Sequence, residues 1–234
     1  MSNNDISYVS CFFGSKLTNI YSSPCNKNSF FFTNNPKLKI HIESKGWKYK
    51  YVNKPLSSSV FISSLQSKYI KFLIFLNDFP EIKSQYKRIL YLDHKYNLST
   101  DSQLNIICDI FNTFKNKIFI VRGHRDRRRK LMGEIKNSKK QKRYRINMDK
   151  TIDYIHLMRK HKRFAKKVSV KLTGLIFYNN IEQSLLITKQ VYDLCLLHQQ
   201  PQCQIYFTAI ISQSKYSDLW TSLPYWPNHF KHKR

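Results

Sequence analysis

The chain has 234 residues, of which 41% are hydrophobic and 15% aromatic, so it can bury a core and is not a disordered chain. Its formal net charge is +27, from 41 basic and 14 acidic residues. Such a charge predicts an anionic partner, namely nucleic acid, nucleotide phosphate, acidic glycan or an anionic membrane surface. Lysines outnumber arginines by 30 to 11, which follows the codons of an AT-rich virus, protist or bacterium, so base composition accounts for part of the excess.

No targeting or membrane signal is visible. The longest candidate for a membrane helix, residues 72–76, is far shorter than the roughly 18 apolar residues that a span needs. Residues 1–5 have neither the basic nor the apolar region of a signal peptide, so we expect a cytoplasmic protein. The five cysteines are scattered without CxxC spacing, which predicts reduced thiols and no zinc site.

The first half of the chain alternates between strand and helix patterns. We expect strands at residues 6–13, 29–33, 47–52, 89–92 and 117–121, a helix at 59–79 and another from residue 99. This order predicts an α/β fold with a mostly parallel sheet flanked by helices. We expect a single domain with a first half at 6–121, a second half at 122–211 and a C-terminal arm at 212–234.

The strand at 89–92 is short, apolar and typical of a strand buried on both faces. Asp93 follows it at once, at the carboxyl edge of the predicted sheet, where ligands bind in open α/β folds. Lys95 emerges on the same side of an extended chain. The two groups could hold a ribose hydroxyl and a diphosphate, with Lys95 supplying charge that a divalent cation usually provides. The alternatives are a turn residue and a local ion pair worth less than about 1 kcal/mol.

Basic residues concentrate between residues 122 and 171, which hold twenty Lys or Arg and four Asp or Glu. We expect two helices at 132–164, separated by a basic break at 137–145, that form either an anion-binding wall or a solvated face. His124 and the arginines around it follow the strand at 117–121, where guanidinium groups can bind phosphate. Beyond this segment we expect a strand at 168–178 and a helix at 181–198. Gly174 lies inside that strand and indicates a close backbone approach.

Several short blocks stand in a recognisable order between about residues 6 and 211. They are FTNNP at 32–36, Trp47, KRILYLDHK at 87–95, the HxxR…E pattern of His124, Arg127 and Glu134, GLI at 174–176 and QIYF at 204–207. The ordered set resembles nucleotide-sugar glycosyltransferases of the GT-A fold. It is most similar to the glycosyltransferase-like family of otherwise unknown function that includes plant proteins linked to cell-wall polysaccharide.

The resemblance implies a GT-A-like, Rossmann-like sheet that binds a nucleotide sugar. It implies a nucleotide-binding half at 6–121 and a half for the acceptor and the donor sugar at 122–211. Asp93 would occupy the first position of an Asp-x-Asp-like site, near the ribose or a Mn²⁺ or Mg²⁺ ion, and Gln204 would face the donor sugar or acceptor as a second catalytic residue. The implied substrate-binding residues are Thr33, Asn34, Arg88, Lys95, His124, Arg127, Glu134 and Gly174. Two departures stand out, since Lys95 replaces the metal-binding Asp of many GT-A enzymes and Cys203 replaces an Asp before Gln204.

The predicted function is therefore transfer of a sugar from a nucleoside-diphosphate sugar to a glycan or protein acceptor, which the basic segment would suit if the acceptor is acidic. One alternative is a degenerate, inactive glycosyltransferase. The other is a non-catalytic nucleic-acid-binding protein, in which the basic segment contacts phosphates and Tyr144, Tyr154 and Phe164 stack on bases.

Overall fold

The computed structural model describes residues 5–16, 19–98, 100–123, 130–161 and 168–223. These residues form a seven-stranded mixed sheet with the strand order β3-β2-β1-β4-β6-β5-β7. The strands are β1 (Ile6–Cys11), β2 (Ser29–Thr33), β3 (Lys48–Tyr51), β4 (Arg88–Leu92), β5 (Phe119–Gly123), β6 (Lys171–Tyr178) and β7 (Trp220–Leu223). Only β6 runs against the others within the described sheet. The predicted α/β fold with a mostly parallel sheet is confirmed.

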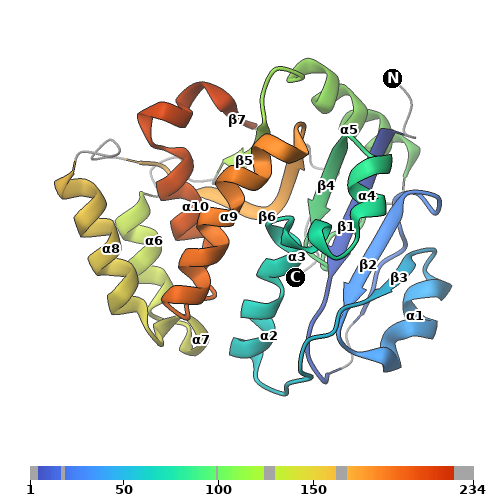
Figure 1. Cartoon of the computed structure of the whole chain (residues 1–234), viewed down its shortest axis with the longest axis horizontal. Coiled ribbons are helices and arrows are strands. Elements are labelled where there is room, and N and C mark those ends of the chain that lie inside the picture. Colours follow the sequence, from blue (N-terminus) through green and yellow to red (C-terminus); the bar gives the residue numbers. More distant parts are fainter. Residues whose placement is uncertain (1–4, 17–18, 99, 124–129, 162–167, 224–234) are drawn as a thin grey trace.

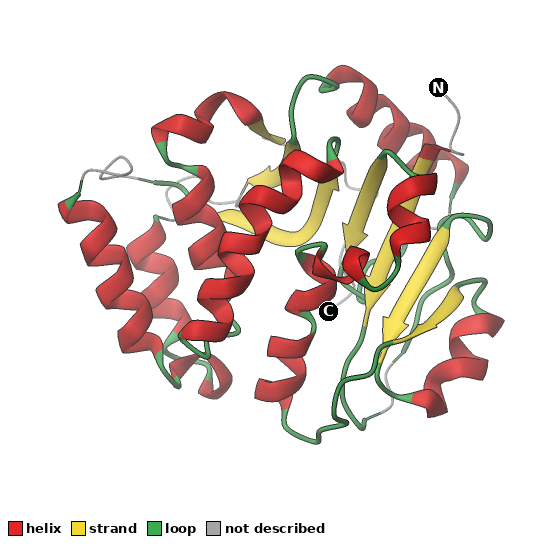
Figure 2. Ribbon diagram, viewed as in Figure 1, coloured by secondary structure: helices red, strands yellow, loops and turns green. Residues whose placement is uncertain are grey.

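Helices cover both faces of this sheet (Figures 1 and 2). They are α1 (Lys39–Ser44), α2 (Val60–Gln66), α3 (Lys68–Lys71), α4 (Pro80–Gln85), α5 (Asp101–Thr113), α6 (Leu131–Ser138), α7 (Lys142–Arg145), α8 (Met148–Lys160), α9 (Ile181–Leu197) and α10 (Cys203–Ile211), with 3-10 turns η2 (Pro36–Leu38), η3 (Ile74–Asn77) and η4 (Ser214–Leu219). The strands alternate their side chains between two cores. Val9 and Cys11 of β1 pack with α3, α9 and α10, whereas Ile6 and Tyr8 pack with α1 and α5.

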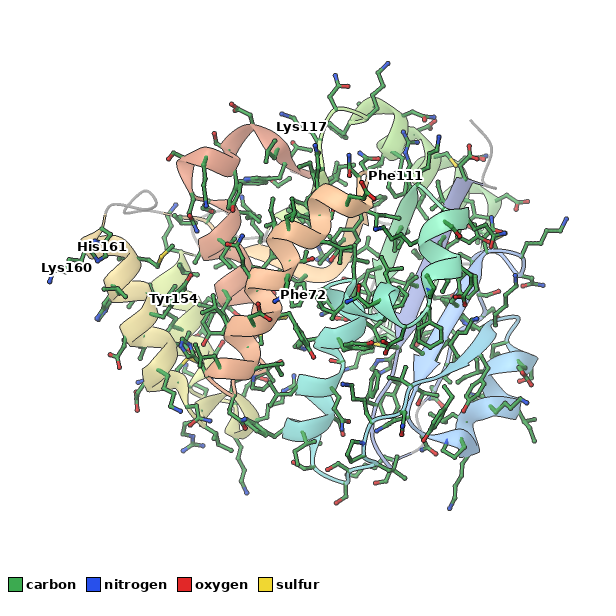
Figure 3. The ribbon with its side chains drawn as sticks, in the orientation of Figure 1. Phe72, Phe111, Lys117, Tyr154, Lys160 and His161 are labelled. Carbon is green, nitrogen blue, oxygen red and sulfur yellow. The ribbon has the colours of Figure 1, made fainter. Side chains whose placement is uncertain are left out.

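The basic half forms a helical unit beside the sheet. Leu131 and Ile135 of α6, Met148 and Ile155 of α8, and Ile205 of α10 form its separate core. The two helices expected in this segment are present, and the basic break between them contains the short helix α7. Figure 3 shows Tyr154 on α8 beside the neighbouring helices, while Lys160 and His161 lie at the outer end of α8.

The helix expected at 59–79 is wrong as a continuous element, because the chain forms α2, α3 and η3 there. Leu73 ends the helical path with a left-handed φ of 66° and is fully buried. A leucine rarely adopts this conformation. The break has a packing reason, since residues 72–76 are apolar and a continuous helix would expose some of them. The turn lets Phe72, Phe75 and Leu76 all be buried.

Other elements differ in detail from the expectation. Helix α1 was not expected, and the apolar residues at 204–211 form helix α10. Strand β6 runs antiparallel to its neighbours, and side-chain periodicity does not encode the direction of a strand. Residues 214–223 of the expected C-terminal arm form η4 and the edge strand β7, and residues 224–234 lie outside the described residues. No helix in the described ranges is both long and apolar enough to cross a membrane.

Candidate functional site

A cavity of about 490 Å³ opens at the carboxyl ends of β1 and β4. From β1 the sheet extends through β2 on one side and through β4 on the other. The switch point of the topology therefore lies between β1 and β4. In open α/β sheets the crevice outside the strands at such a point is the usual ligand site. Asp93, directly after β4, lines this cavity, as its position in the sequence predicts.

The floor of the cavity is an ion pair between Asp93 and Lys71. The Nζ of Lys71, on α3, lies 3.0 Å from the Oδ1 of Asp93. The Tyr91 hydroxyl donates a hydrogen bond of 2.7 Å to the same oxygen. The Lys71 side chain is only 7% exposed, but that of Asp93 is 37% exposed toward the cavity. The carboxylate is therefore fixed by two donors and still accessible to a ligand.

Both members of this pair are ionised at neutral pH. Burial opposes the charge of Asp93, but the Lys71 ammonium and the Tyr91 hydrogen bond outweigh it and lower the pKa of the carboxyl group. Burial also opposes the charge of Lys71, and the nearby Asp93 carboxylate raises its pKa above the ordinary value. Burial, followed by the charge of Asp93, raises the pKa of Tyr91 well above its usual range, so its hydroxyl remains a donor.

The cavity as a whole is electropositive. Lys68 precedes Lys71 by one helical turn, is 6% exposed and donates a hydrogen bond of 3.3 Å to the Ser67 hydroxyl. Lysine is almost never fully buried unless it is paired. The described lining residues include five basic side chains and one carboxylate, a net charge of +4. They are Lys16, Lys68, Lys71, Lys95 and Arg143 against Asp93. Such a cleft attracts and concentrates anions.

Polar groups line the walls of the cavity. Serine hydroxyls from α2 and the residues around it form one wall, at Ser57, Ser58, Ser63, Ser64 and Ser67. Arg143 and Tyr144 of α7 form part of the rim. Phe12, after β1, meets His94, after β4, edge to face with ring centroids 5.0 Å apart. The contact joins the ends of the two central strands at the cavity.

Two asparagines hold the loop after β1 through hydrogen bonds to Gly14. The backbone N–H of Gly14 donates to the Asn34 side-chain oxygen at 3.0 Å, and the Asn35 amide donates to the Gly14 carbonyl at 3.1 Å. Gly14 has a φ of +119°, and a Cβ there would lie 2.7 Å from the Ser63 hydroxyl oxygen, so the position requires glycine. Asn34 thus supports the cavity-lining residue Gly14 without being among the described lining residues itself, and Thr33, which is not among them either, accepts a hydrogen bond from the Asn35 N–H.

Gly174 lies against Asp93, which is the kind of close backbone approach that a glycine inside a strand predicts. Its carbonyl accepts a hydrogen bond of 2.8 Å from the Asp93 backbone N–H. A Cβ at Gly174 would lie 3.1 Å from Asp93 Oδ2 and 3.1 Å from the Tyr96 hydroxyl oxygen. The absence of a side chain therefore leaves room for the Asp93 carboxylate to keep its orientation.

The remaining predicted site residues are dispersed. Lys95 is exposed and lines the cavity, but the ammonium paired with Asp93 is that of Lys71. Arg88 begins β4, at the end opposite Asp93, with its guanidinium 5.6 Å from the Phe111 ring centroid. His124 and Arg127 lie outside the described residues.

Glu134 and Gln204 lie in the helical unit. Glu134 is buried on α6, where its carboxylate accepts a hydrogen bond of 2.9 Å from Gln202. Gln204 is half-buried near the start of α10 and is not among the described residues that line the cavity. Cys203, which precedes it, is buried, and its sulfur lies 3.6 Å from the Thr173 hydroxyl oxygen on β6.

A buried glutamine positions the rim. The Gln200 amide nitrogen donates to the carbonyls of Tyr144 and Ile146, at 3.0 and 3.1 Å. Its own oxygen accepts a hydrogen bond of 3.1 Å from the Gln202 backbone N–H. Gln200 is fully buried, so its own end of these bonds is shielded from water. The loop between α9 and α10 thus fixes the end of α7.

Sequence reasoning missed Lys68, Lys71 and Gln200. One signal was present for the lysines, which stand three residues apart in the apolar run KYIKFLIFL. In a helix this spacing places both on one face, and the apolar neighbours require that face to be mostly buried. Nothing near Gln200 in the sequence points to α7, because the contact depends on the tertiary fold.

The described residues do not fit a divalent-cation site. Mn²⁺ and Mg²⁺ favour several carboxylate, carbonyl or water oxygens. Within the described ranges no three His, Cys, Asp or Glu side chains gather to hold an ion. Asp93 is the one described carboxylate at the cavity, and its Oδ1 already accepts Lys71 and Tyr91.

The fold is similar to those of two solved glycosyltransferases. Mouse xyloside xylosyltransferase 1, in its apo form, aligns with a TM-score of 0.46 and 11% identity over 94% of this chain and 85% of the mouse chain. A glycosyltransferase involved in glycosylation of the major capsid of PBCV-1 aligns with a TM-score of 0.43 and 12% identity over 93% of this chain and 81% of the other. No protein-family model and no curated protein matches the sequence.

Proposed function

We propose that this protein is a glycosyltransferase that binds a nucleoside-diphosphate sugar in the cavity at the ends of β1 and β4. The observation that carries the proposal is a carboxylate next to two buried ammonium groups at the switch point of an α/β sheet. A carboxylate accepts hydrogen bonds from ribose hydroxyls, and ammonium groups bind phosphate oxygens. The volume of about 490 Å³ lies within the range of small-ligand pockets.

In the proposed reaction an acceptor hydroxyl oxygen forms a bond to the anomeric carbon of the donor sugar. The bond from that carbon to the diphosphate breaks, the diphosphate leaves with the electron pair, and the acceptor proton is released. Lys68 and Lys71 stabilise the charge that develops on the leaving diphosphate, because they are already in place in a poorly hydrated site. Asp93 orients the donor. Gln204 is not among the described residues that line the cavity, and the proposed mechanism assigns it no role.

The acceptor in this proposal is an anionic glycan or protein. Six exposed basic side chains lie close in sequence to the cavity rim, at Lys136, Lys139, Lys140, Lys142, Arg145 and Lys150. The exposed carboxylate Asp149 pairs with Lys139 at 3.2 Å, which leaves most of this charge uncompensated. Arg143 and Tyr144 connect the basic segment to the cavity, so an acidic acceptor bound there would reach the donor.

The proposal is tested by thermal unfolding in the presence of UDP, GDP, ADP and CMP, followed by transfer and hydrolysis assays with the matching nucleotide sugars. A ligand at 100 times its Kd stabilises the folded state by about 2.7 kcal/mol. We expect one nucleoside diphosphate to raise the unfolding temperature and Asp93→Asn to remove the effect. If none of the nucleotides stabilises the protein, the proposal is wrong.

Nucleic-acid binding is the second candidate, because the exposed basic segment alone would support it. Two of the three aromatic residues predicted to stack are already engaged. Arg143 lies over the Tyr144 ring at 4.5 Å, and Tyr154 packs against His198 and Tyr206, while Phe164 lies outside the described residues. A salt titration of RNA and DNA binding separates the candidates. Tight binding with a steep salt dependence, unaffected by nucleoside diphosphates, would favour this second function.

A further inference from the structure

Lys71 occupies the position that a divalent cation bound to Oδ1 of Asp93 would take. Its Nζ is 3.0 Å from Oδ1, and a magnesium ion bound to that oxygen would lie about 2.1 Å away. The two cations cannot share this side of the carboxylate without strong repulsion. We propose that the cavity binds its nucleoside diphosphate without a divalent cation, and that Lys71, supported by Lys68, is the built-in counter-ion for the diphosphate. This inference rests on the proposed function.

The fold holds Lys71 in place from three directions. Its carbonyl accepts a hydrogen bond of 2.6 Å from the hydroxyl of Tyr178 on β6. Its ammonium is paired with Asp93 after β4. The left-handed turn at Leu73 ends the helical path two residues later, and the Leu73 side chain is fully buried. An ammonium held this firmly needs little reorganisation to meet a phosphate, which is the property that a bound metal ion contributes.

Lys68 supplies charge that is not already used by Asp93. It lies one turn before Lys71 on α3, so both side chains reach the cavity from the same helix face. Its hydrogen bond to Ser67 is to a neutral hydroxyl, whereas Lys71 is paired with a carboxylate. The described lining residues have a net charge of +4, which is sufficient to neutralise a diphosphate without an added cation.

The test compares nucleotide binding by calorimetry in EDTA and in Mn²⁺ or Mg²⁺, with the full chain and the nucleoside diphosphate that stabilises it. For the wild type we expect equal affinity, within about twofold, in both conditions. Lys71→Met removes the ammonium but keeps the length of the side chain. We expect it to bind about 10- to 100-fold more weakly in EDTA, the range for a lost hydrogen bond to a charged group, and to recover affinity with Mn²⁺ because the side of Asp93 Oδ1 that faced the ammonium becomes free.

Two further variants test where the Mn²⁺ binds and whether the loss of affinity is specific to Lys71. Lys71→Met/Asp93→Asn should lose the recovery by Mn²⁺, which places the metal on Asp93. Lys189→Ala removes an exposed lysine on α9 that pairs with Asp193 at 2.7 Å, and it should bind as the wild type does. Circular dichroism confirms that each variant is folded. The wild-type comparison of EDTA with Mn²⁺ or Mg²⁺ tests the inference even if a variant fails to fold.

The outcomes separate this inference from the function on which it rests. Wild-type binding that requires Mn²⁺ or Mg²⁺ overturns the inference and leaves the glycosyltransferase proposal standing. Wild-type affinity for Lys71→Met in EDTA also overturns it, because Lys71 would then contribute nothing to binding. A failure to bind any nucleoside diphosphate in either condition overturns both proposals.

Discussion

The ammonium of Lys71 and the carboxylate of Asp93 are 3.0 Å apart, on a helix and a strand end that form the floor of one cavity. The pair joins α3 to β4 and also determines the charge that a ligand meets. A disturbance of either residue is therefore expected to affect both stability and binding. Variants of the two residues and of their neighbours separate these two effects.

The first prediction concerns coupling within the pair. Asp93→Asn leaves the buried ammonium of Lys71 without its carboxylate, and Lys71→Met leaves the carboxylate without its ammonium. We expect each single variant to lower the free energy of unfolding by about 1–3 kcal/mol, and the double variant to lose less than the sum. Urea denaturation of all four proteins measures the coupling. The exposed pair Lys189 and Asp193 is the control, with an expected coupling of about 0.3–0.5 kcal/mol. Strict additivity at Lys71 and Asp93 would contradict the prediction.

The second prediction is the pH dependence of that stability. The folded state lowers the pKa of Asp93 below the unfolded value of about 3.9. A lowered pKa stabilises the folded state above the unfolded pKa, and the contribution is lost as the pH falls through the folded pKa. The stability difference between wild type and Asp93→Asn should therefore be constant from about pH 5 to 8 and shrink below about pH 4. Urea unfolding across this range measures it, and a difference that persists unchanged at about pH 2 would show that the carboxyl group is not perturbed.

The third prediction uses two glycines. In Gly174→Ala the new methyl group lies 3.1 Å from Asp93 Oδ2, so the carboxylate must move by a few tenths of an ångström. We expect nucleotide affinity to fall about tenfold, because binding depends on this orientation. Gly133→Ala is the matched control, since a Cβ there meets nothing within 4 Å and the residue lies inside α6. It should stabilise the protein by about 0.5–1 kcal/mol and leave affinity unchanged. Equal affinity in both variants would remove Gly174 from the site.

The fourth prediction tests the attachment of the rim. Gln200→Ala removes the donor to the carbonyls of Tyr144 and Ile146, so the end of α7 should loosen. We expect a loss of about 1–3 kcal/mol in stability and faster amide hydrogen exchange at residues 141–147, with little change in exchange on β4. Gln190→Ala, at an exposed glutamine that bonds Leu186 and Tyr216, is the control. Unchanged exchange in α7 would mean that other contacts hold the rim.

The position of Asp93 could be predicted because it depends on local pattern. A short apolar strand followed by a carboxylate fixes the strand end, and parallel strands place their ends together. Arg88 shows the limit of the same reasoning. It is the first residue of the strand that Asp93 follows, so the two lie at opposite ends of five strand residues that each advance about 3.3 Å. Arg88 and Asp93 are close in the sequence, but the length of the strand places them at opposite edges of the sheet.

The partner of Asp93 could not be predicted from the same pattern. Lys95 is near in sequence, and Lys71 is near in space only because the helical path breaks at Leu73 and α3 packs beside β1 and β4. The break results from the need to bury Phe72, Phe75 and Leu76, which is a tertiary requirement. Helical periodicity predicts one continuous apolar stripe over these residues and does not predict the break at Leu73.

The pairing of β4 with β6 has a practical consequence for dissection of the chain. Residues 89–92 in the first half of the chain hydrogen-bond to residues 175–178 in the second half, and Gln200 holds α7 from a still later segment. A fragment that stops after β5 would display an uncovered apolar strand edge, the kind of surface that draws chains into aggregates. Neither half is therefore a module that can be produced, crystallised or transplanted by itself.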